Sequence, residues 1–110
     1  MALNKKNRLK KKRDFEDVFK KGKAVKGSFL FIKHRKNNLG VPRFGFAVSA
    51  KIAKKAVERN KIRRILSEAV RSIIDDLDGH DVIVFAARKI TAVSRKDIAE
   101  DFLGVLKKIQ

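Results

Sequence analysis

The chain has 110 residues, of which 44% are hydrophobic, so it has the length and apolar content of one ordinary domain. Its 29 lysines and arginines outnumber 12 aspartates and glutamates and leave a formal net charge of +17. The absence of cysteine excludes disulfides and thiolate metal sites. No apolar run approaches the roughly 20 residues of a membrane span, and the basic start lacks the hydrophobic stretch of a secretory signal. We therefore expect a cytoplasmic protein.

The positive charge is concentrated in the first two-thirds of the chain. Residues 1–71 hold 23 basic and five acidic side chains, a net +18, whereas residues 72–110 hold six and seven, a net −1. A merely solubilising surface mixes the two signs along the chain. The asymmetry therefore predicts a surface in residues 1–71 that attracts a polyanion.

The first segments are a tail and a short helix. Residues 1–12 are polar and rich in lysine, and we expect a flexible basic tail that is ordered only if the rest of the protein pins it. Phe15, Val18 and Phe19 have the spacing of one helix face and predict a helix over residues 13–21. Gly22 is a natural end for that helix.

Two strands are expected next. Residues 28–36 are continuously apolar as far as Ile32, and residues 43–49 form a second short apolar run. Between them, residues 37–42 hold Asn, Gly and Pro, which favour a turn. A β-hairpin is the simplest connection between the two strands.

The remainder predicts a long helix, a buried strand and a last helix. Residues 50–57 read as a basic connector, and residues 58–77 carry an apolar stripe formed by Ile62, Leu66, Ala69, Val70, Ile73 and Leu77. Residues 82–88 are rich in β-branched side chains, as in a buried strand. Ser94 is a candidate N-cap for a helix with an inner face of Ile98, Phe102, Val105 and Ile109.

These elements follow one another in the order α-β-β-α-β-α, which predicts a single-domain α/β sandwich over residues 1–110. We expect a central, mostly antiparallel sheet of three to four strands. The strand, long helix and strand after residue 43 suggest a βαβ crossover with one parallel pair.

The sequence offers little for protein-based catalysis or metal binding. Neither His34 nor His80 lies in a recognisable catalytic motif. The acidic residues Asp75, Asp76, Asp78 and Asp81 could in principle bind a divalent ion through oxygen ligands, but their spacing matches no calcium or magnesium loop. A solvated turn is the better interpretation, so we expect no catalytic residue and no metal site.

A basic helix carries the strongest functional signal. On a helix with Ile62 facing inward, Asn60, Arg63 and Arg64 share an adjacent face, and Arg59 lies at its border. Arginine binds phosphate through paired hydrogen bonds, and asparagine suits a ribose hydroxyl or a base edge. Ordinary surface helices instead pair glutamate with lysine at one-turn spacing. The pattern predicts a contact with structured RNA.

Phenylalanines set among basic residues give a second signal. Phe29 and Phe31 alternate along the first strand beside Lys33, and Phe15 and Phe19 lie one turn apart on the first helix. Aromatic side chains among cations form stacking platforms for unpaired bases. Burial in the core explains the same residues equally well, because a small domain needs its phenylalanines inside.

Much of the chain resembles the bacterial ribonuclease P protein. The central match is GFAVSAKIAKKAVERNKIRRILSEAVR, residues 45–71, in which a glycine-bearing strand and a basic connector precede an Arg-Asn-Arg-like motif. Lys61 takes the third position of that motif and keeps the charge without the guanidinium fork. Residues 13–22 resemble the family's first helix, and residues 81–89 resemble its last strand.

The resemblance implies the protein subunit of an endoribonuclease holoenzyme that removes the 5′ leader from precursor tRNA. It implies that the RNA subunit carries the catalytic site with its Mg²⁺, that the protein binds no cofactor itself, and that the βαβ crossover is left-handed. The expected partners are ribonuclease P RNA and precursor tRNA, without a membrane or an obligate protein partner.

The resemblance also assigns two groups of site residues. Those expected to bind the RNA subunit are Lys51, Lys54, Lys55, Arg59, Asn60, Lys61, Arg63 and Arg64. Those expected to hold the single-stranded leader, in a cleft between the first helix and the sheet, are Phe15, Phe19, Phe31 and Lys33.

Two other classes of protein stay open on the residues alone. A basic ribosomal protein would share the size, the charge and the lack of catalytic residues, and copurification with ribosomal subunits would identify it. A DNA-binding module is less well supported, because the sequence has neither a helix-turn-helix pair nor a zinc site.

The charge asymmetry yields a first prediction. Affinity for RNA should fall steeply as salt rises, because each neutralised phosphate releases counterions and contributes about −0.9 to the log–log slope on a duplex. Titrations of the protein with RNA at several salt concentrations measure this slope. A slope near zero would show that phosphate contacts do not carry the binding.

Overall fold

The computed structural model describes residues 3–109, except for the side chains of Arg88 and Lys89. In chain order, the elements in these residues are η1 (Lys5–Asn7), α1 (Lys12–Lys21), β1 (Lys23–Lys26), β2 (Leu30–Lys36), β3 (Arg43–Ala47), α2 (Ala56–Arg71), η2 (Ile74–Asp76), β4 (His80–Ala86), η3 (Arg88–Ala92) and α3 (Arg95–Lys107), where η denotes a 3-10 helix. The mixed α/β fold is confirmed, and β1 is a short fourth strand, within the expected three to four.

The strands form one mixed sheet in the order β1-β2-β4-β3. The β1–β2 and β2–β4 pairs are antiparallel, whereas β3 and β4 are parallel and joined through α2. The predicted hairpin between residues 28–36 and 43–49 is therefore wrong, because β4 lies between these strands. The physical reason is that Val82 and Val84 of β4 pack into the main core and Ile83 into the cluster beneath α1, so β4 is buried on both faces at the middle of the sheet.

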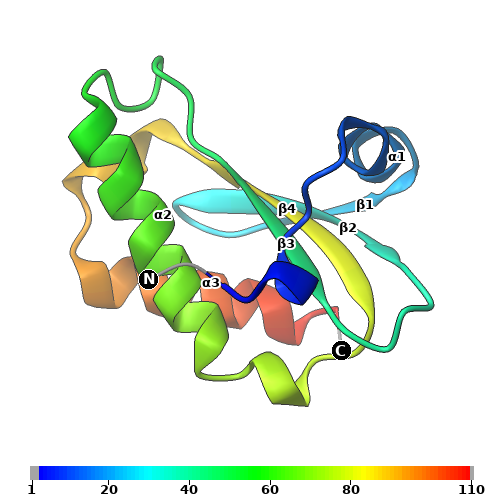
Figure 1. Cartoon of the computed structure of the whole chain (residues 1–110). Coiled ribbons are helices and arrows are strands. Elements are labelled where there is room, and N and C mark those ends of the chain that lie inside the picture. Colours follow the sequence, from blue (N-terminus) through cyan, green and yellow to red (C-terminus); the bar gives the residue numbers. More distant parts are fainter. Residues whose placement is uncertain (1–2, 110) are drawn as a thin grey trace.

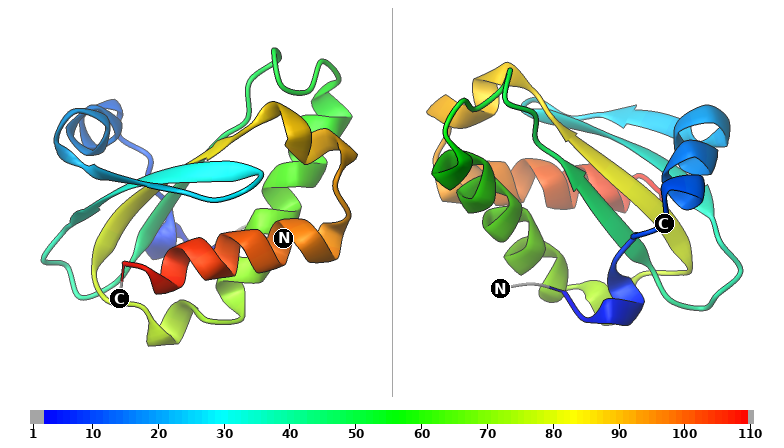
Figure 2. Two further views of the ribbon diagram at one scale, coloured as in Figure 1. Left: turned by 180° about the vertical axis from the view of Figure 1, so that it is seen from behind. Right: turned by 45° about the horizontal axis from the view of Figure 1, so that its top comes forward.

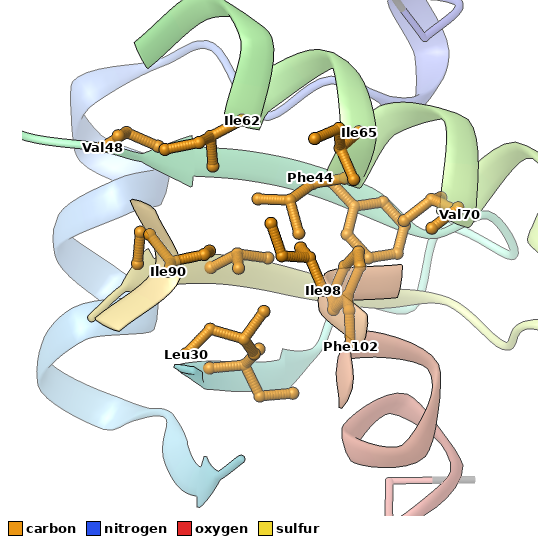
Figure 3. Close-up of a cluster of buried hydrophobic side chains, with 14 of the residues drawn as sticks. Leu30, Phe44, Val48, Ile62, Ile65, Val70, Ile90, Ile98 and Phe102 are labelled. Atoms are coloured by element: carbon orange, nitrogen blue, oxygen red, sulfur yellow. The ribbon is translucent and has the colours of Figure 1, made fainter. Parts of the chain in front are cut away.

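The helices cover opposite faces of the sheet: α2 and α3 pack on one, and α1 lies on the other (Figure 1 and Figure 2). The main core lies between the sheet and the α2–α3 layer, where Leu30, Phe44 and Phe102 meet (Figure 3). A smaller cluster beneath α1 contains the buried residues Leu9, Val18 and Ile83.

The predicted helix ends are confirmed at two positions and wrong at a third. Gly22 ends α1, and Ser94 caps α3 by accepting a hydrogen bond of 3.2 Å from the Asp97 amide. In contrast, α2 ends at Arg71 rather than at Leu77. Ile73 and Leu77 pack against the core from the irregular segment that follows α2. Their burial explains why both positions are apolar and why the sequence pattern extended the helix to Leu77.

The amino-terminal segment is packed rather than free between residues 3 and 9. Leu3 and Leu9 are buried, the Asn7 side chain donates a 2.8 Å hydrogen bond to the Pro42 carbonyl, and the Leu9 amide donates one of 2.9 Å to the Phe44 carbonyl. This packing contradicts the expected flexible tail over residues 1–12, of which residues 1 and 2 lie outside the described part. Its few apolar residues cover the edge of β3 and so pin the segment.

The acidic turn after α2 does not behave as one solvated cluster. Asp75, Asp76 and Asp78 are exposed, but Asp81 is buried and forms a two-pronged ion pair with Arg43, with distances of 2.8 and 2.6 Å. The interpretation of Asp81 as part of a solvated turn is therefore wrong. Residues 3–109 hold no group of three or more His, Asp or Glu side chains placed to share a metal ion. No helix in them is long and apolar enough to cross a membrane.

His34 gives the fold a predicted pH dependence. Burial lowers the pKa of His34, and the nearby charges of His80 and Lys23 lower it further. Because the folded pKa lies below the ordinary value of 6.5, the unfolded chain binds more protons just below pH 6.5, and acid destabilises the fold. Urea midpoints of the parent and His34→Gln proteins at pH 7.5 and 5.5 measure this. The parent should lose more stability on acidification, and equal losses would contradict the prediction.

Candidate nucleic-acid interface

Exposed cations surround the start of α2. The loop between β3 and α2 carries Lys51, Lys54 and Lys55, and all three side chains are exposed. These lysines directly precede α2 and lie beside its first turns. The three ammonium groups are point charges on flexible side chains and do not form a shaped pocket, as is typical of lysines that bind phosphates.

Arg59 lies at the border of the predicted row and braces this loop. Its guanidinium donates hydrogen bonds of 3.0 and 2.9 Å to the carbonyl oxygens of Ala53 and Lys54. The side chain thus holds the loop against the first turn of α2. Its direct role in the structure is to position the lysine-bearing loop.

Asn60, Arg63 and Arg64 face a hollow of about 480 Å³ between α2, β3 and the amino-terminal segment. Arg8 and Lys10 contribute cations from the opposite wall. We call this hollow the basic groove; its lining residues are Leu3, Arg8, Leu9, Lys10, Phe15, Phe44, Gly45, Phe46, Asn60, Arg63, Arg64 and Ser67. Arg63 donates to Asn60 Oδ1 at 3.1 Å and approaches the Val48 carbonyl at 3.4 Å, so these side chains are held in place.

Lys61 is separated from that row. It lines a different hollow, between α2 and η3, together with Glu58, Ile90 and Ile98. Side chains one position apart on a helix point about 100° apart, which explains the separation. The residues predicted to contact the RNA subunit therefore lie in three places: the loop before α2, the basic groove, and the separate position of Lys61.

The predicted leader residues gather on the other face of the sheet, beneath α1. A hollow of about 260 Å³ is lined by Phe15, Glu16, Phe19, Lys20, Ala47, Ile83 and Phe85, and we call it the aromatic hollow. Phe19 is 53% exposed, which is unusual for so large an apolar side chain. Its ring lies 6.1 Å from that of Phe85. Open aromatic surface at this position can accept a stacked base.

Phe31 and Lys33 support this hollow from β2. The Phe31 ring stacks on Phe85 with centroids 4.7 Å apart, because the two residues are partners in the β2–β4 register. Lys33 donates a 2.9 Å hydrogen bond to the Phe19 carbonyl and lies 4.0 Å from the centroid of the Phe19 ring. Phe31 is thus a backing residue, and Lys33 supplies a cation at the edge.

Two contacts fix α1 over the sheet. Phe15 rests on Gly45 of β3, where any side chain would overlap its ring. Arg43 of β3, already paired with Asp81, also binds Asp14 of α1 at 3.3 Å. The hydrogen bond with Asp81 raises the pKa of Arg43 despite partial burial, so this guanidinium stays charged. The helix is therefore anchored on both its apolar and its polar side.

Sequence reasoning missed Phe85, Arg8 and Lys10 as site residues. Phe85 becomes a site residue only through its pairing with Phe31, which the erroneous hairpin concealed. Arg8 and Lys10 were assigned to a free tail, although the buried Leu9 between them was an available signal of packing. Both omissions arose from long-range contacts.

The arrangement suits RNA on chemical grounds. The basic groove offers guanidinium forks and a carboxamide, and the aromatic hollow offers exposed rings beside cations. Phosphates and structured RNA match the first set, and unpaired bases match the second.

Comparisons with known proteins agree with this chemistry. The family model described as "Ribonuclease P" matches residues 3–110. The ribonuclease P protein component of Pelotomaculum thermopropionicum is 38% identical over 103 residues, covering 93% of this chain and 91% of that protein. The structure resembles the RNase P protein of Staphylococcus aureus (TM-score 0.88, 30% identity, 94% and 95% of the two chains). It also resembles that of Thermotoga maritima in complex with 1-(4-fluorophenyl)-2-thiourea (TM-score 0.87, 32% identity, 94% and 100%).

The two arginines at either end of the row should respond differently to substitution. Arg64 is exposed, so Arg64→Ala should weaken RNA binding while leaving the melting temperature unchanged. Arg59→Ala removes two hydrogen bonds from a charged donor and should also cost about 1 kcal/mol of stability. Melting curves and RNA titrations of both variants test this. Equal melting temperatures for the two variants would show that Arg59 does not brace the loop.

Proposed function

Because this chain belongs to the ribonuclease P protein family, we propose that it holds the single-stranded 5′ leader of precursor tRNA in the aromatic hollow. As the RNA-binding protein component of ribonuclease P, the chain is a subunit of an endoribonuclease holoenzyme that acts in tRNA processing. It works together with the ribonuclease P RNA. The proposal concerns how this chain divides its surface between two RNA molecules.

The exposure of Phe19 is the observation that carries the leader assignment. A ring that is 53% exposed gains little from the core, yet it is held beside Phe85 and capped by Lys33. A stacked base would bury the exposed ring, and the Lys33 ammonium would then lie near the neighbouring phosphate. Bases within a duplex cannot stack in this way, so the hollow favours an unpaired strand such as a leader.

The cations around the start of α2 lie on the opposite side of the sheet from α1 (Figure 1). We assign the RNA subunit to this surface, formed by Lys51, Lys54, Lys55, Asn60, Arg63 and Arg64, with Arg59 as the brace of the loop. Guanidinium forks and flexible lysines suit the dense phosphates of a folded RNA. One protein could then contact both RNA molecules simultaneously.

In this proposal the RNA subunit and its magnesium ions supply the chemistry. The protein supplies leader affinity and correct placement, since binding one end of a substrate lowers the entropic cost of aligning the other. The test is reconstitution of the full chain with a ribonuclease P RNA and precursor tRNA at low magnesium. Cleavage at the mature 5′ end that requires the protein is the expected result, and protein-independent cleavage would contradict the proposal.

Phe15 and Phe19 should separate packing from leader binding. Phe19→Ala should keep the melting temperature and lose affinity for leader-bearing tRNA by roughly 1–3 kcal/mol, the value of one stacked base. Phe15→Ala should destabilise the fold, by less than the roughly 3–5 kcal/mol of a fully buried phenylalanine, because Phe15 is only half-buried on Gly45.

Affinities for leader-bearing and mature tRNA, with melting curves, measure both effects. Val57→Ala is the matched control, because Val57 is an exposed apolar residue on α2, 77% accessible and away from the aromatic hollow. Equal losses of affinity for both tRNAs in Phe19→Ala would remove the aromatic hollow as the leader site.

A further inference from the structure

We propose that the basic groove binds a single unpaired nucleotide, with its base on the floor formed by β3 and its phosphates between the two basic walls. The inference deepens the proposed function, since it relies on RNA as the partner of this surface. It differs in assigning a base pocket to a place where the family motif alone suggests contacts with phosphates.

The walls of the groove provide one sign of charge from two separate parts of the chain. Arg8 and Lys10 come from the amino-terminal segment, and Arg63 and Arg64 come from α2, with no carboxylate among the lining residues. The aromatic hollow includes Glu16, and the hollow between α2 and η3 includes Glu58. Cations that face one hollow without counter-charge favour a bound anion.

The floor of the groove is apolar and aromatic. Phe46 is half-buried, Phe44 is buried beneath it, and the half-buried ring of Phe15 covers Gly45, so the accessible apolar surface is that of Phe15 and Phe46. The hollow of about 480 Å³ falls within the range of about 300–1,000 Å³ that is typical of sites for small organic ligands. A nucleotide fits these dimensions, whereas a duplex, which is far wider, would contact only the rim.

Unused hydrogen-bonding groups favour a ligand in the groove. The Arg8 Nε is buried and finds no acceptor among the described residues. A buried donor without a partner costs free energy, more so when it is charged, and Arg8, which is half-buried, also lines the groove. The carboxamide of Asn60 accepts from Arg63, and its amino group can donate to the edge of a base.

The groove is built before any ligand binds. Leu9 bonds to Phe44 of β3 and Asn7 bonds to Pro42 just before that strand, so both hold the wall that carries Arg8 and Lys10, and Arg63 is held by Asn60 and the Val48 carbonyl. Pre-organised walls reduce the entropic cost of binding. Because Asn60, Arg63 and Arg64 line the groove and belong to the surface assigned above to the RNA subunit, the unpaired nucleotide comes from that RNA.

Crosslinking in the assembled holoenzyme identifies the nucleotide. The chain has no cysteine, so Lys10→Cys in the full chain can be labelled with a photo-crosslinker at one position only. We expect crosslinks concentrated on one unpaired nucleotide of the RNA subunit, whereas crosslinks on the leader would overturn the assignment of this groove to that RNA. Lys96→Cys on α3, an exposed position, is the control. Crosslinks spread along duplex RNA, or matching the control, would overturn the proposal.

An abasic substitution at the crosslinked nucleotide then tests whether its base occupies the groove. Removing the base should weaken binding roughly 5- to 150-fold, the range of one stacked base. In Arg8→Ala the same substitution should have a much smaller effect, because the base has lost its site. If Arg8→Ala melts at a lower temperature than the parent, the abasic effect is measured instead in Arg64→Ala, because Arg64 is exposed.

The outcomes separate this inference from the proposed function. If the abasic RNA binds as tightly as the parent, or if its effect is unchanged in the arginine variants, the nucleotide site is wrong. Phe19→Ala measured in the same preparations would still report on the leader. If Phe19→Ala loses the discrimination between leader-bearing and mature tRNA while the abasic substitution has no effect, the nucleotide site in the basic groove is wrong. The proposed leader site in the aromatic hollow then still stands.

Discussion

The position of β4 between β2 and β3 is the constraint on which both RNA surfaces depend. Val82, Ile83 and Val84 are buried in succession, so β4 needs cover on both of its faces, and its place between β2 and β3 lies under the helices on both sides. Its central place puts α2 and α3 on one face of the sheet and α1 on the other (Figure 2). It also sets Phe85 opposite Phe31, which builds the back of the aromatic hollow.

The contacts that hold α1 explain how a ten-residue helix can shape a binding site. Phe15 needs the bare backbone of Gly45, and Asp14 needs Arg43, whose charge Asp81 secures. Phe15 also borders both the basic groove and the aromatic hollow. One side chain therefore lies between the two surfaces.

Most of the positive charge is not neutralised within the described residues. The ion pairs found there use Arg43 and Arg95, and the Arg95–Glu68 pair is largely exposed and contributes little stability. The fold is instead held by the two apolar clusters, which leaves the cations of α2, its preceding loop and the amino-terminal segment available for RNA. Arg59 and Phe15 serve both stability and a binding surface, whereas the exposed Arg64 can be changed without loss of the fold.

The sequence by itself determined the basic helix, the apolar faces, the Ser94 cap and the family, because these features depend on residues near one another along the chain. It left open whether Phe15 and Phe19 belong to the core or to a site, and the structure places one half-buried on Gly45 and the other largely in solvent. Only the tertiary structure decided the strand order, the packing of Leu3 and Leu9, and the pairing of Phe31 with Phe85. These depend on contacts between distant segments, for which local periodicity carries no information.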